Sequence, residues 1–443
     1  MTPSPWHLPE DETGDLPPGP LEGIRVLEFA TILAVPSCGV HLSDMGADVI
    51  KIEPPTGDPH RGALSIIPGE GKGFIAMNRG KRSVCVDLTR PESRAIIDRL
   101  VKDSDIVLVS LKPSDLPRFG LSYERLRQVN PALIYLEQQP YGEMGPYGGD
   151  GGYDVVVQGL SGTAAMMARS NGSVPQTVVP AIADMTTGVS SALAVVAALR
   201  HRDRTDEGQR VRSSLLASSI LLAGNRTSWF GATDPDNFER FAREIDAARA
   251  RGADFEEQRD IYIDVFSPAV RLGGNTYFRY YQTSNGTISV GSTSPTINAR
   301  IRRIWGLEDP RHNSNFDMTS AEDRTKLKTF AEACEARMLE RTSEDWMEAF
   351  RAESIPSALV NWPSESFTDQ QIEANRFYAE LDHDLVGPHK TFGPVVQMDA
   401  TPLRTHGSSP PLDRDTDSVL EAAGLTAEDL ETLRAAGVIG RAG

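Results

Sequence analysis

The sequence predicts an α/β fold in which helices cover both faces of a parallel sheet. Five short apolar runs alternate with helical stretches over residues 23–138. The first two runs and the helix between them span about 30 residues, the size of one βαβ unit. A chain of 443 residues is long enough for one large core or two ordinary ones. The composition changes over residues 205–270, which marks the expected boundary between two domains.

The first elements follow from apolar runs and the residues that bound them. Residues 23–30 (GIRVLEFA) and 47–53 (ADVIKIE) are predicted strands. A helix is expected between them, beginning near Pro36 and ending at Gly46, because proline favours a first helical turn and glycine favours a helix end. Further strands are predicted at 82–88, 104–111 and 132–138, with helices over 91–102 and 123–129.

After this region the pattern changes. Six glycines in residues 141–154 interrupt the alternation, and a small-residue helix (185–200) and a strand–helix pair (209–220) follow. Asn285-Gly286 predicts a hairpin, because Asn-Gly supplies the two positive φ angles of a type I′ turn. The other predicted helices are 237–251, 320–340, 343–351, 369–377 and two short ones at the C-terminus, the second opening with a capping box at Thr426.

The charge balance excludes several classes of function. Lys and Arg total 45 against 62 Asp and Glu, a formal net charge of −17, whereas a general nucleic-acid binder needs positive charge over its footprint. No window approaches 18 uncharged apolar residues, so no membrane span is expected. The acidic, proline-rich start does not resemble a signal peptide. We therefore expect a cytoplasmic enzyme with no membrane or nucleic-acid partner.

The βαβ unit at 23–53 raises the question of a nucleotide site, with Glu53 placed like a ribose-binding acid. A dinucleotide fingerprint needs glycines so that the backbone can approach a pyrophosphate. The loop here, FATILAVPS (29–37), has none. An NAD site of the usual kind is not expected, while another nucleotide in another pose stays open.

A local group of cations reverses the overall sign of the chain. Between residues 61 and 90 six cations face only Glu70 and Asp87. We call these cations the charge island, and they are Arg61, Lys72, Arg79, Lys81, Arg82 and Arg90. Such an island would concentrate a phosphate-bearing ligand. The alternative is a solvated face that balances its acidic neighbours.

Asp184 precedes a helix rich in Ala, Ser and Val. One interpretation is a helix N-cap, since Asp is among the best capping residues. The other is a carboxylate nucleophile, kept ionised by the helix dipole and placed where backbone N–H groups stabilise an oxyanion. The local sequence does not decide between them.

Metal and serine chemistry have little support. The three cysteines lie far apart, and the eight histidines include no i,i+4 pair and no HExxH context. No G-x-S-x-G elbow is present, and Leu160-Ser161-Gly162 comes nearest. We expect no metal site.

Segments spread over nearly the whole chain from residue 21 occur in a specific order and spacing. They are LEGIRVLEFA (21–30), GADVIKIEPP (46–55) with Gly57-Asp58, NRGKRS (78–83) with VDL (86–88), GPYGG (145–149) with GYD (152–154), DMTTG (184–188), GQRV (208–211) with SLLA (214–217), YQTSNG (281–286), VG (290–291) and TDSVL (416–420). Together they resemble the family III CoA-transferases, the superfamily of formyl-CoA transferase and carnitine CoA-transferase.

The resemblance implies an interlocked homodimer. Each subunit would have a large Rossmann-like domain with a parallel sheet, a smaller α+β domain and long linkers. On this chain we expect a mobile tail at 1–20, the large CoA-binding domain at 21–205, a linker and variable segment at 206–270, the small domain at 271–370 and a C-terminal segment at 371–443 that returns to the large domain.

The resemblance also implies where CoA binds. CoA would lie along the loop Ile32, Leu33 and Ala34 and near Val86 and Leu111. The other residues expected to contact CoA are Lys81, Arg82, Arg90, Arg118 and Tyr153. Asp184 matches the catalytic aspartate of the family, which favours the nucleophile over the cap, although one residue can serve both roles. Acyl-CoA and a carboxylic acid would be substrates, and no prosthetic group is expected.

The implied mechanism is covalent. Asp184 attacks a donor acyl-CoA thioester, which gives a mixed anhydride and CoA thiolate. The thiolate then attacks the aspartyl carbonyl, so that CoA is held as an enzyme thioester while the donor acid leaves. An acceptor carboxylate reverses the sequence. This route conserves the thioester energy that hydrolysis would lose.

Two alternatives remain. The same fold hosts α-methylacyl-CoA racemases, which pair the helix aspartate with a His and carry a Glu after the hairpin strand. This chain has Tyr153 and Ser294 at those positions, and neither suits proton transfer at neutral pH. A catalytically silent CoA-binding protein is the other alternative, which the retained DMTTG motif disfavours.

Overall fold

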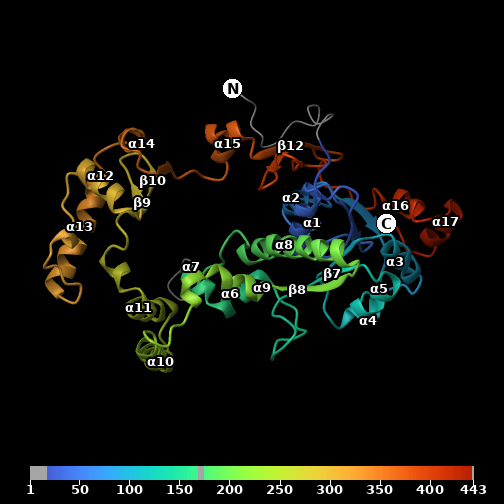
Figure 1. Ribbon diagram of the computed structural model, residues 1–443, viewed down its shortest axis with the longest axis horizontal. Coiled ribbons are helices and arrows are strands. Elements are labelled where there is room, and N and C mark those ends of the chain that lie inside the picture. Colours follow the sequence, from blue (N-terminus) through green and yellow to red (C-terminus); the bar gives the residue numbers. More distant parts are fainter. Residues whose placement is uncertain (1–16, 168–173, 442–443) are drawn as a thin grey trace. The chain divides into compact units, whose positions relative to one another are not determined.

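The computed structural model describes residues 17–167 and 174–441, so most of the predicted tail at 1–20 lies outside the described residues. The chain divides into two compact units. The first contains the described residues up to 167, Gln176–Ser228 and the chain from Thr368 onward, and the second contains Trp229–Phe367. The colours of Figure 1 show the blue and red ends of the chain together in the first unit.

A six-stranded parallel sheet forms the centre of the first unit, in the order β5-β2-β1-β6-β7-β8. The strands are β1 (Arg25–Phe29), β2 (Asp48–Glu53), β5 (Arg82–Cys85), β6 (Ile106–Val109), β7 (Ile134–Gln139) and β8 (Gln209–Ser214). All five predicted apolar runs are strands of this sheet. The chain runs outward from β1 through β2 to β5 and then resumes on the other side of β1. The order therefore reverses between β1 and β6, and ligands of open α/β sheets bind outside the carboxyl ends of the strands at such a switch point.

Helices cover both faces of the sheet. The helices of the first unit are α1 (Ala34–Asp44), α2 (Lys72–Asn78), α3 (Ser93–Lys102), α4 (Asp115–Phe119), α5 (Tyr123–Val129), α6 (Asp154–Ser161), α7 (Thr163–Met167), α8 (Ile182–Thr205), α9 (Leu215–Leu222), α15 (Gln370–Asn375), α16 (Thr416–Ala422) and α17 (Ala427–Ala435). Two short antiparallel pairs, β3 (Ser65–Ile67) with β4 (Glu70–Gly71) and β12 (Tyr378–His383) with β13 (Gly387–Phe392), complete the unit.

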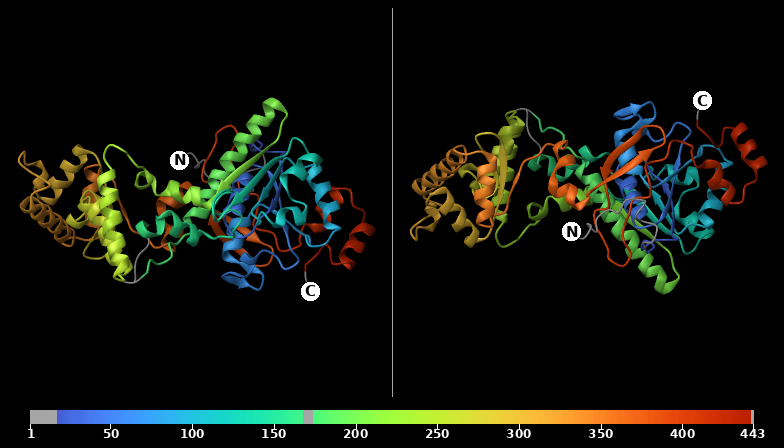
Figure 2. Two further views of the ribbon diagram at one scale, coloured as in Figure 1. Left: turned by 90° about the horizontal axis from the view of Figure 1, so that it is seen from below. Right: turned by 90° about the horizontal axis from the view of Figure 1, so that it is seen from above.

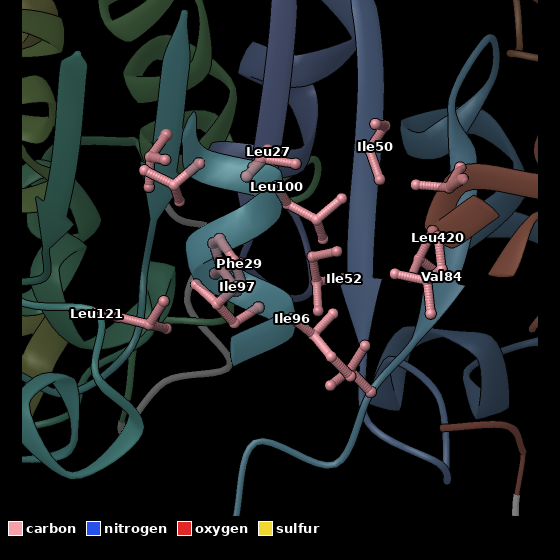
Figure 3. Packing of buried hydrophobic residues seen from close by; sticks show 14 of the residues in the cluster. Leu27, Phe29, Ile50, Ile52, Val84, Ile96, Ile97, Leu100, Leu121 and Leu420 are labelled. Atoms are coloured by element: carbon pink, nitrogen blue, oxygen red, sulfur yellow. The ribbon is translucent and has the colours of Figure 1, made fainter. Parts of the chain in front are cut away.

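The sheet buries a separate apolar core on each face. On one face α3, α16 and α17 cover the strands. Figure 3 labels Leu27, Phe29, Ile50, Ile52, Val84, Ile96, Ile97, Leu100, Leu121 and Leu420 of this core. On the other face α1 and α8 lie side by side over β1, β2, β6 and β7 (Figure 1). A sheet that is buried on both faces explains why its strands are continuous apolar runs.

The C-terminal segment belongs to the first unit. Val438 and Ile439 are buried in the same core as α3, and Ile439 forms a β-bridge with Val86. Figure 2 shows α16 and α17, in red, beside the helices that follow β5 and β6. The chain thus returns to the parallel sheet at its end.

The second unit is built on a three-stranded antiparallel sheet in the order β11-β10-β9. Its elements are α10 (Pro235–Ala250), α11 (Phe255–Phe266), β9 (Phe278–Gln282), β10 (Thr287–Gly291), α12 (Pro295–Trp305), α13 (Ala321–Met338), α14 (Ser343–Ala352) and β11 (Ser357–Leu359). The predicted hairpin is confirmed, because Thr287 pairs with Gln282. The predicted type I′ turn is wrong, because neither Asn285 nor Gly286 has a positive φ, and four residues (283–286) rather than two connect the strands. The predicted linker at 206–270 is divided: β8 and α9 belong to the first unit, whereas α10 and α11 belong to the second.

Helix α8 is longer than the predicted 185–200. By length and composition it is apolar enough to cross a membrane, with a mean hydropathy of 1.6 in its best window, which the sequence expectation missed. One face of α8, with Ala192, Val195, Ala198 and Leu199, is buried in the sheet core, as expected of a core helix in a globular protein.

The contact between α1 and α8 depends on Gly188, and this generates a prediction. A Cβ at Gly188 would meet the Ser37 hydroxyl and lie 2.8 Å from the Ala34 carbonyl oxygen. Gly188→Ala should therefore destabilise the protein by about 1–3 kcal/mol, as overpacking does. Gly159→Ala in α6 is the matched control, because nothing lies within 4 Å of its added Cβ, and it should be neutral or stabilise by up to about 1 kcal/mol. Urea unfolding of both variants is the measurement, and equal stabilities would contradict the packing argument.

Candidate active site

The loop after β1 has a strained backbone at Ile32. Its φ is +70°, a left-handed conformation that a β-branched residue rarely adopts and that costs about 1–3 kcal/mol. The Ile32 N–H donates to the Asp58 carboxylate at 3.2 Å, and its carbonyl lies 3.0 Å from the Nδ1 of His60. Leu33 and Ala34 then begin α1. The predicted CoA loop is therefore held in one shape at the switch point.

Four buried charged side chains hold the loop after β1 in place. Lys51 Nζ lies 3.0 Å from both Glu28 and Asp58 and donates to the Ala30 carbonyl at 2.8 Å. Lys81 Nζ donates to Glu28 at 2.8 Å and to the Pro36 carbonyl at 2.9 Å. We call Glu28, Lys51, Asp58 and Lys81 the charge cluster. Its two cations and two anions balance and connect β1, β2 and the segment before β5 to both ends of the loop.

Burial affects the two lysines of the charge cluster differently. Desolvation opposes the charge of Lys51, but Glu28 and Asp58 outweigh it and raise its pKa above the usual range. For Lys81, desolvation dominates over Glu28 and lowers the pKa to about 8. The charge on Lys81 thus depends on keeping its carboxylate partner.

These contacts contradict the predicted role of the charge island. Lys81 is fully buried in the charge cluster, and Arg82 pairs with Asp48 at the amino ends of β5 and β2, away from the switch point. Arg79 pairs with Asp44, and Arg61 pairs with Glu53 and Glu70. Glu53 is thereby engaged as a structural partner rather than as a free ribose-binding acid. In the island only Lys72 and Arg90 are exposed, and Arg90 lies 3.6 Å from Asp87.

Asp184 is the third residue of α8 and does not cap it. The cap comes instead from Asp154, the first residue of α6. The Asp154 carboxylate accepts the backbone N–H of Ala183 at 2.8 Å and that of Asp184 at 3.1 Å. Its other oxygen accepts a hydrogen bond from Gln158. The capping interpretation of Asp184 is therefore wrong, and the Asp184 carboxylate is not used to cap α8.

The electrostatics of Asp184 differ from the expected effect of a helix dipole. Burial, with a further contribution from the Asp154 carboxylate, raises the pKa of Asp184 to about 7. The backbone N–H groups at the start of α8 were the expected oxyanion donors. Those of Ala183 and Asp184 already donate to the Asp154 carboxylate, so they are engaged in the capping interaction.

The fold brings several predicted residues together. Ala34, Val157 and Ala183 share one buried apolar cluster, which places the loop after β1 beside the first turn of α8. Tyr153 precedes α6 and is 63% exposed, next to Asp154. No pattern in the sequence assigns Asp58 or Asp154 a role in the site.

Other predicted CoA contacts lie further along the carboxyl edge of the sheet. Val86 is buried beneath Ile439, so its side chain is not available to a ligand. Leu111 is partly buried against the core after β6. Arg118 is exposed at the end of α4, with its guanidinium over the ring of Phe119.

A cavity of about 360 Å³ lies beside α4 and α5, under the glycine-rich segment at 148–149. Glu137, Gln139 and Arg210 line it, and Arg210 is bonded to Glu137 at 2.7 Å. It does not include Asp184.

Comparisons with known proteins agree with the fold. A family model described as CoA-transferase family III matches residues 21–416. The succinate–glutarate CoA-transferase of Agrobacterium fabrum is 31% identical over 90% of this chain and 95% of its own length. The succinyl-CoA–L-malate CoA-transferase beta subunit of Chloroflexus aurantiacus is 26% identical over 95% and 98%. A crystal structure of Rv3272 from M. tuberculosis has the same fold, with a TM-score of 0.71 at 24% identity over 90% of this chain and 99% of that chain.

The raised pKa of Asp184 predicts a pH-dependent stability. Because the pKa of about 7 in the folded state exceeds the ordinary value of an aspartate, 3.8, the folded state holds a proton over this range, and stability falls as pH rises toward 7. The Asp184→Asn variant has no carboxyl group at this position, so its stability should not fall in this way as pH rises. Its gain in unfolding free energy over wild type should grow from pH 4 to pH 7 and reach at least about 1 kcal/mol.

Urea unfolding as a function of pH is the measurement. Asp203→Asn, at the exposed end of the same helix, is the matched control and should show no such growth. A pH-independent difference for Asp184→Asn would contradict the electrostatic argument.

Proposed function

The chain belongs to CoA-transferase family III, and on that premise we propose that it moves CoA from an acyl-CoA thioester to a carboxylic acid through Asp184. The observation that carries the proposal is the freedom of this carboxylate. Asp154 performs the capping that Asp184 would otherwise provide. In the described part of the chain no side chain donates a hydrogen bond to Asp184.

The position of Asp184 supports a nucleophilic role. A carboxylate with a pKa of about 7 is substantially ionised at neutral pH and more basic than an ordinary aspartate, and both properties favour attack on a thioester carbonyl. The carboxylate oxygen adds to the carbonyl, the C–S bond breaks and CoA leaves as the thiolate. The thiolate then attacks the aspartyl carbonyl, the C–O bond to the donor acid breaks, and an aspartyl-CoA thioester results.

Proton transfer for racemisation has less support. A racemase needs a second acid or base facing Asp184. Asp154, the titratable neighbour, is bonded to the N-terminus of α8 and to Gln158. The residue before it is Tyr153 rather than histidine.

For the substrates we propose short dicarboxylic acids and their CoA thioesters. The support is the name of two relatives, which act on succinate with glutarate and on succinyl-CoA with L-malate. Succinyl-CoA with a panel of carboxylic acids, followed by mass spectrometry of the new thioesters, is the first screen.

We further propose a homodimer. Apolar side chains are exposed along three neighbouring helices, with Val155 and Leu160 on α6, Val189 and Leu193 on α8, and Leu221 on α9. Exposed apolar side chains gathered on helices that contact one another favour an interaction site, and the proposed partner is a second copy of the chain.

The nucleophile predicts a covalent intermediate. With wild type and a donor acyl-CoA, hydroxylamine should convert Asp184 to a hydroxamate that peptide mass spectrometry detects. Asp184→Asn should fold and lose CoA exchange by at least about 10³-fold. Asp184→Glu should also fail, because the reacting oxygen is displaced from its attack geometry. Persistent exchange in Asp184→Asn, or exchange of an α-proton of a 2-methylacyl-CoA with deuterium in wild type, would refute the proposal.

The dimer predicts a specific response to charge on α8. Leu193 is 72% exposed, and Leu193→Asp should dissociate the protein into monomers, because a buried unpaired carboxylate at an interface is costly. Leu385→Asp, in the exposed turn between β12 and β13, is the matched control and should leave the dimer intact. Light scattering at micromolar concentration is the measurement, and a monomeric, active wild type would contradict the dimer.

A further inference from the structure

The loop after β1 is accessible over a short stretch. Residues 31–33 are partly exposed, whereas Ala30 on one side and all of α1 on the other are buried. Ile32 is the middle residue of this stretch, and its left-handed φ of +70° sets the direction of the peptide groups on both sides. A β-branched side chain disfavours a positive φ. The shape of the accessible stretch therefore depends on contacts that hold the Ile32 backbone.

Both polar backbone groups of Ile32 are held by the segment after β2. The N–H donates to the Asp58 carboxylate at 3.2 Å, and the carbonyl oxygen lies 3.0 Å from Nδ1 of His60. A carbonyl only accepts, so Nδ1 of His60 carries the proton in this contact. Burial lowers the pKa of His60 below its ordinary value, which keeps the ring neutral at neutral pH. A neutral imidazole has one N–H, and the Ile32 carbonyl accepts it.

Two elements fix the His60 ring in this position. His60 lies in the short 3-10 helix Pro59–Gly62, and its backbone N–H donates to the capping carboxylate of Asp58 at 2.9 Å. The ring also packs against Gly73 in the first turn of α2. A Cβ at Gly73 would meet the Nε2 of His60 and lie 2.5 Å from its Cε1. The absence of a side chain at Gly73 therefore leaves the room that the ring occupies.

The other end of the loop is fixed without His60, because Ala34 at the start of α1 packs with Ala183 of α8. Loss of the His60 contact would therefore release Ile32 and leave α1 and α8 in place. We propose that His60 is a positioning residue for the CoA substrate. By holding the Ile32 carbonyl, it keeps the loop after β1 in the shape that binds the CoA thioester. This inference rests on the proposed function.

The first test removes the imidazole. His60→Ala should raise the Kd for free CoA, measured by calorimetry, roughly fivefold, because the loop then has its binding shape for a smaller fraction of the time. KM for acyl-CoA should rise by a similar factor, with kcat unchanged. His60→Asn should bind CoA nearly as wild type does, since an asparagine amide N–H can replace the Nδ1–H. His312→Ala is the matched control, because His312 is exposed in another short 3-10 helix that an aspartate caps.

Gly73 gives access to the same contact from α2. Gly73→Ala should displace the ring from the Ile32 carbonyl and raise the Kd for CoA about as much as His60→Ala does. In the double variant the ring is absent, so Gly73→Ala should have no further effect in the His60→Ala background. Gly62→Ala is the matched control, because nothing lies within 4 Å of its added Cβ, and it should leave the Kd unchanged.

A spectroscopic readout separates positioning from a general loss of structure. In nitrogen NMR spectra of histidine-labelled wild type, the His60 signals are those that disappear in His60→Asn. They should show a neutral ring with its proton on Nδ1. Gly73→Ala should change these signals without changing those of His312.

Four results would overturn the inference: unchanged CoA affinity in His60→Ala, an equal loss in His312→Ala, additive losses in the double variant, or a His60 proton on Nε2. Calorimetry and NMR need no turnover, so these outcomes are separate from a failure of the proposed function. Failure of the proposed function alone would appear as a wild type that binds CoA and exchanges none.

Discussion

The site depends first on the charge cluster of Glu28, Lys51, Asp58 and Lys81. A dinucleotide fold of the usual kind shapes the loop after β1 with glycines, whereas here Ile32 is held in a left-handed conformation by hydrogen bonds from outside the loop. Asp58 supplies one of them, and Lys51 fixes Asp58. Removing one partner of such a buried set leaves an uncompensated charge and typically costs about 3–5 kcal/mol. The ions therefore specify the shape of the loop.

A second set of contacts connects the loop after β1 to Asp184, the candidate nucleophile. The Asp154 carboxylate satisfies the first N–H groups of α8 from the first turn of α6, and it acts on the Asp184 carboxyl. One side chain thus frees Asp184 from capping and contributes to its raised pKa. Because Ala34 packs with Ala183, a shift of either helix would move the loop after β1 and the carboxylate together. Positioning and basicity of Asp184 consequently share one structural origin.

The charge island shows why local sequence was misleading. Within residues 61–90 the cations outnumber the anions, which suggested a phosphate site. Their partners lie elsewhere: Glu28 is 53 residues from Lys81, Asp44 is 35 from Arg79, and Asp48 is 34 from Arg82. One feature of the sequence did indicate buried ion pairs. Glu28 and Lys51 stand inside apolar runs of a sheet covered on both faces, where a charge must be paired.

The sequence by itself determined what depends on neighbours along the chain. Alternating apolar runs predicted the parallel sheet, Asn285-Gly286 predicted the hairpin, and the ordered motifs predicted the family and singled out Asp184. Only the tertiary structure decided which charges are buried and that Asp154 rather than Asp184 caps α8. These features depend on the order of the strands and the packing of α1 against α8. The contacts involved are between residues far apart in the sequence, and a local pattern of apolar residues does not predict such contacts.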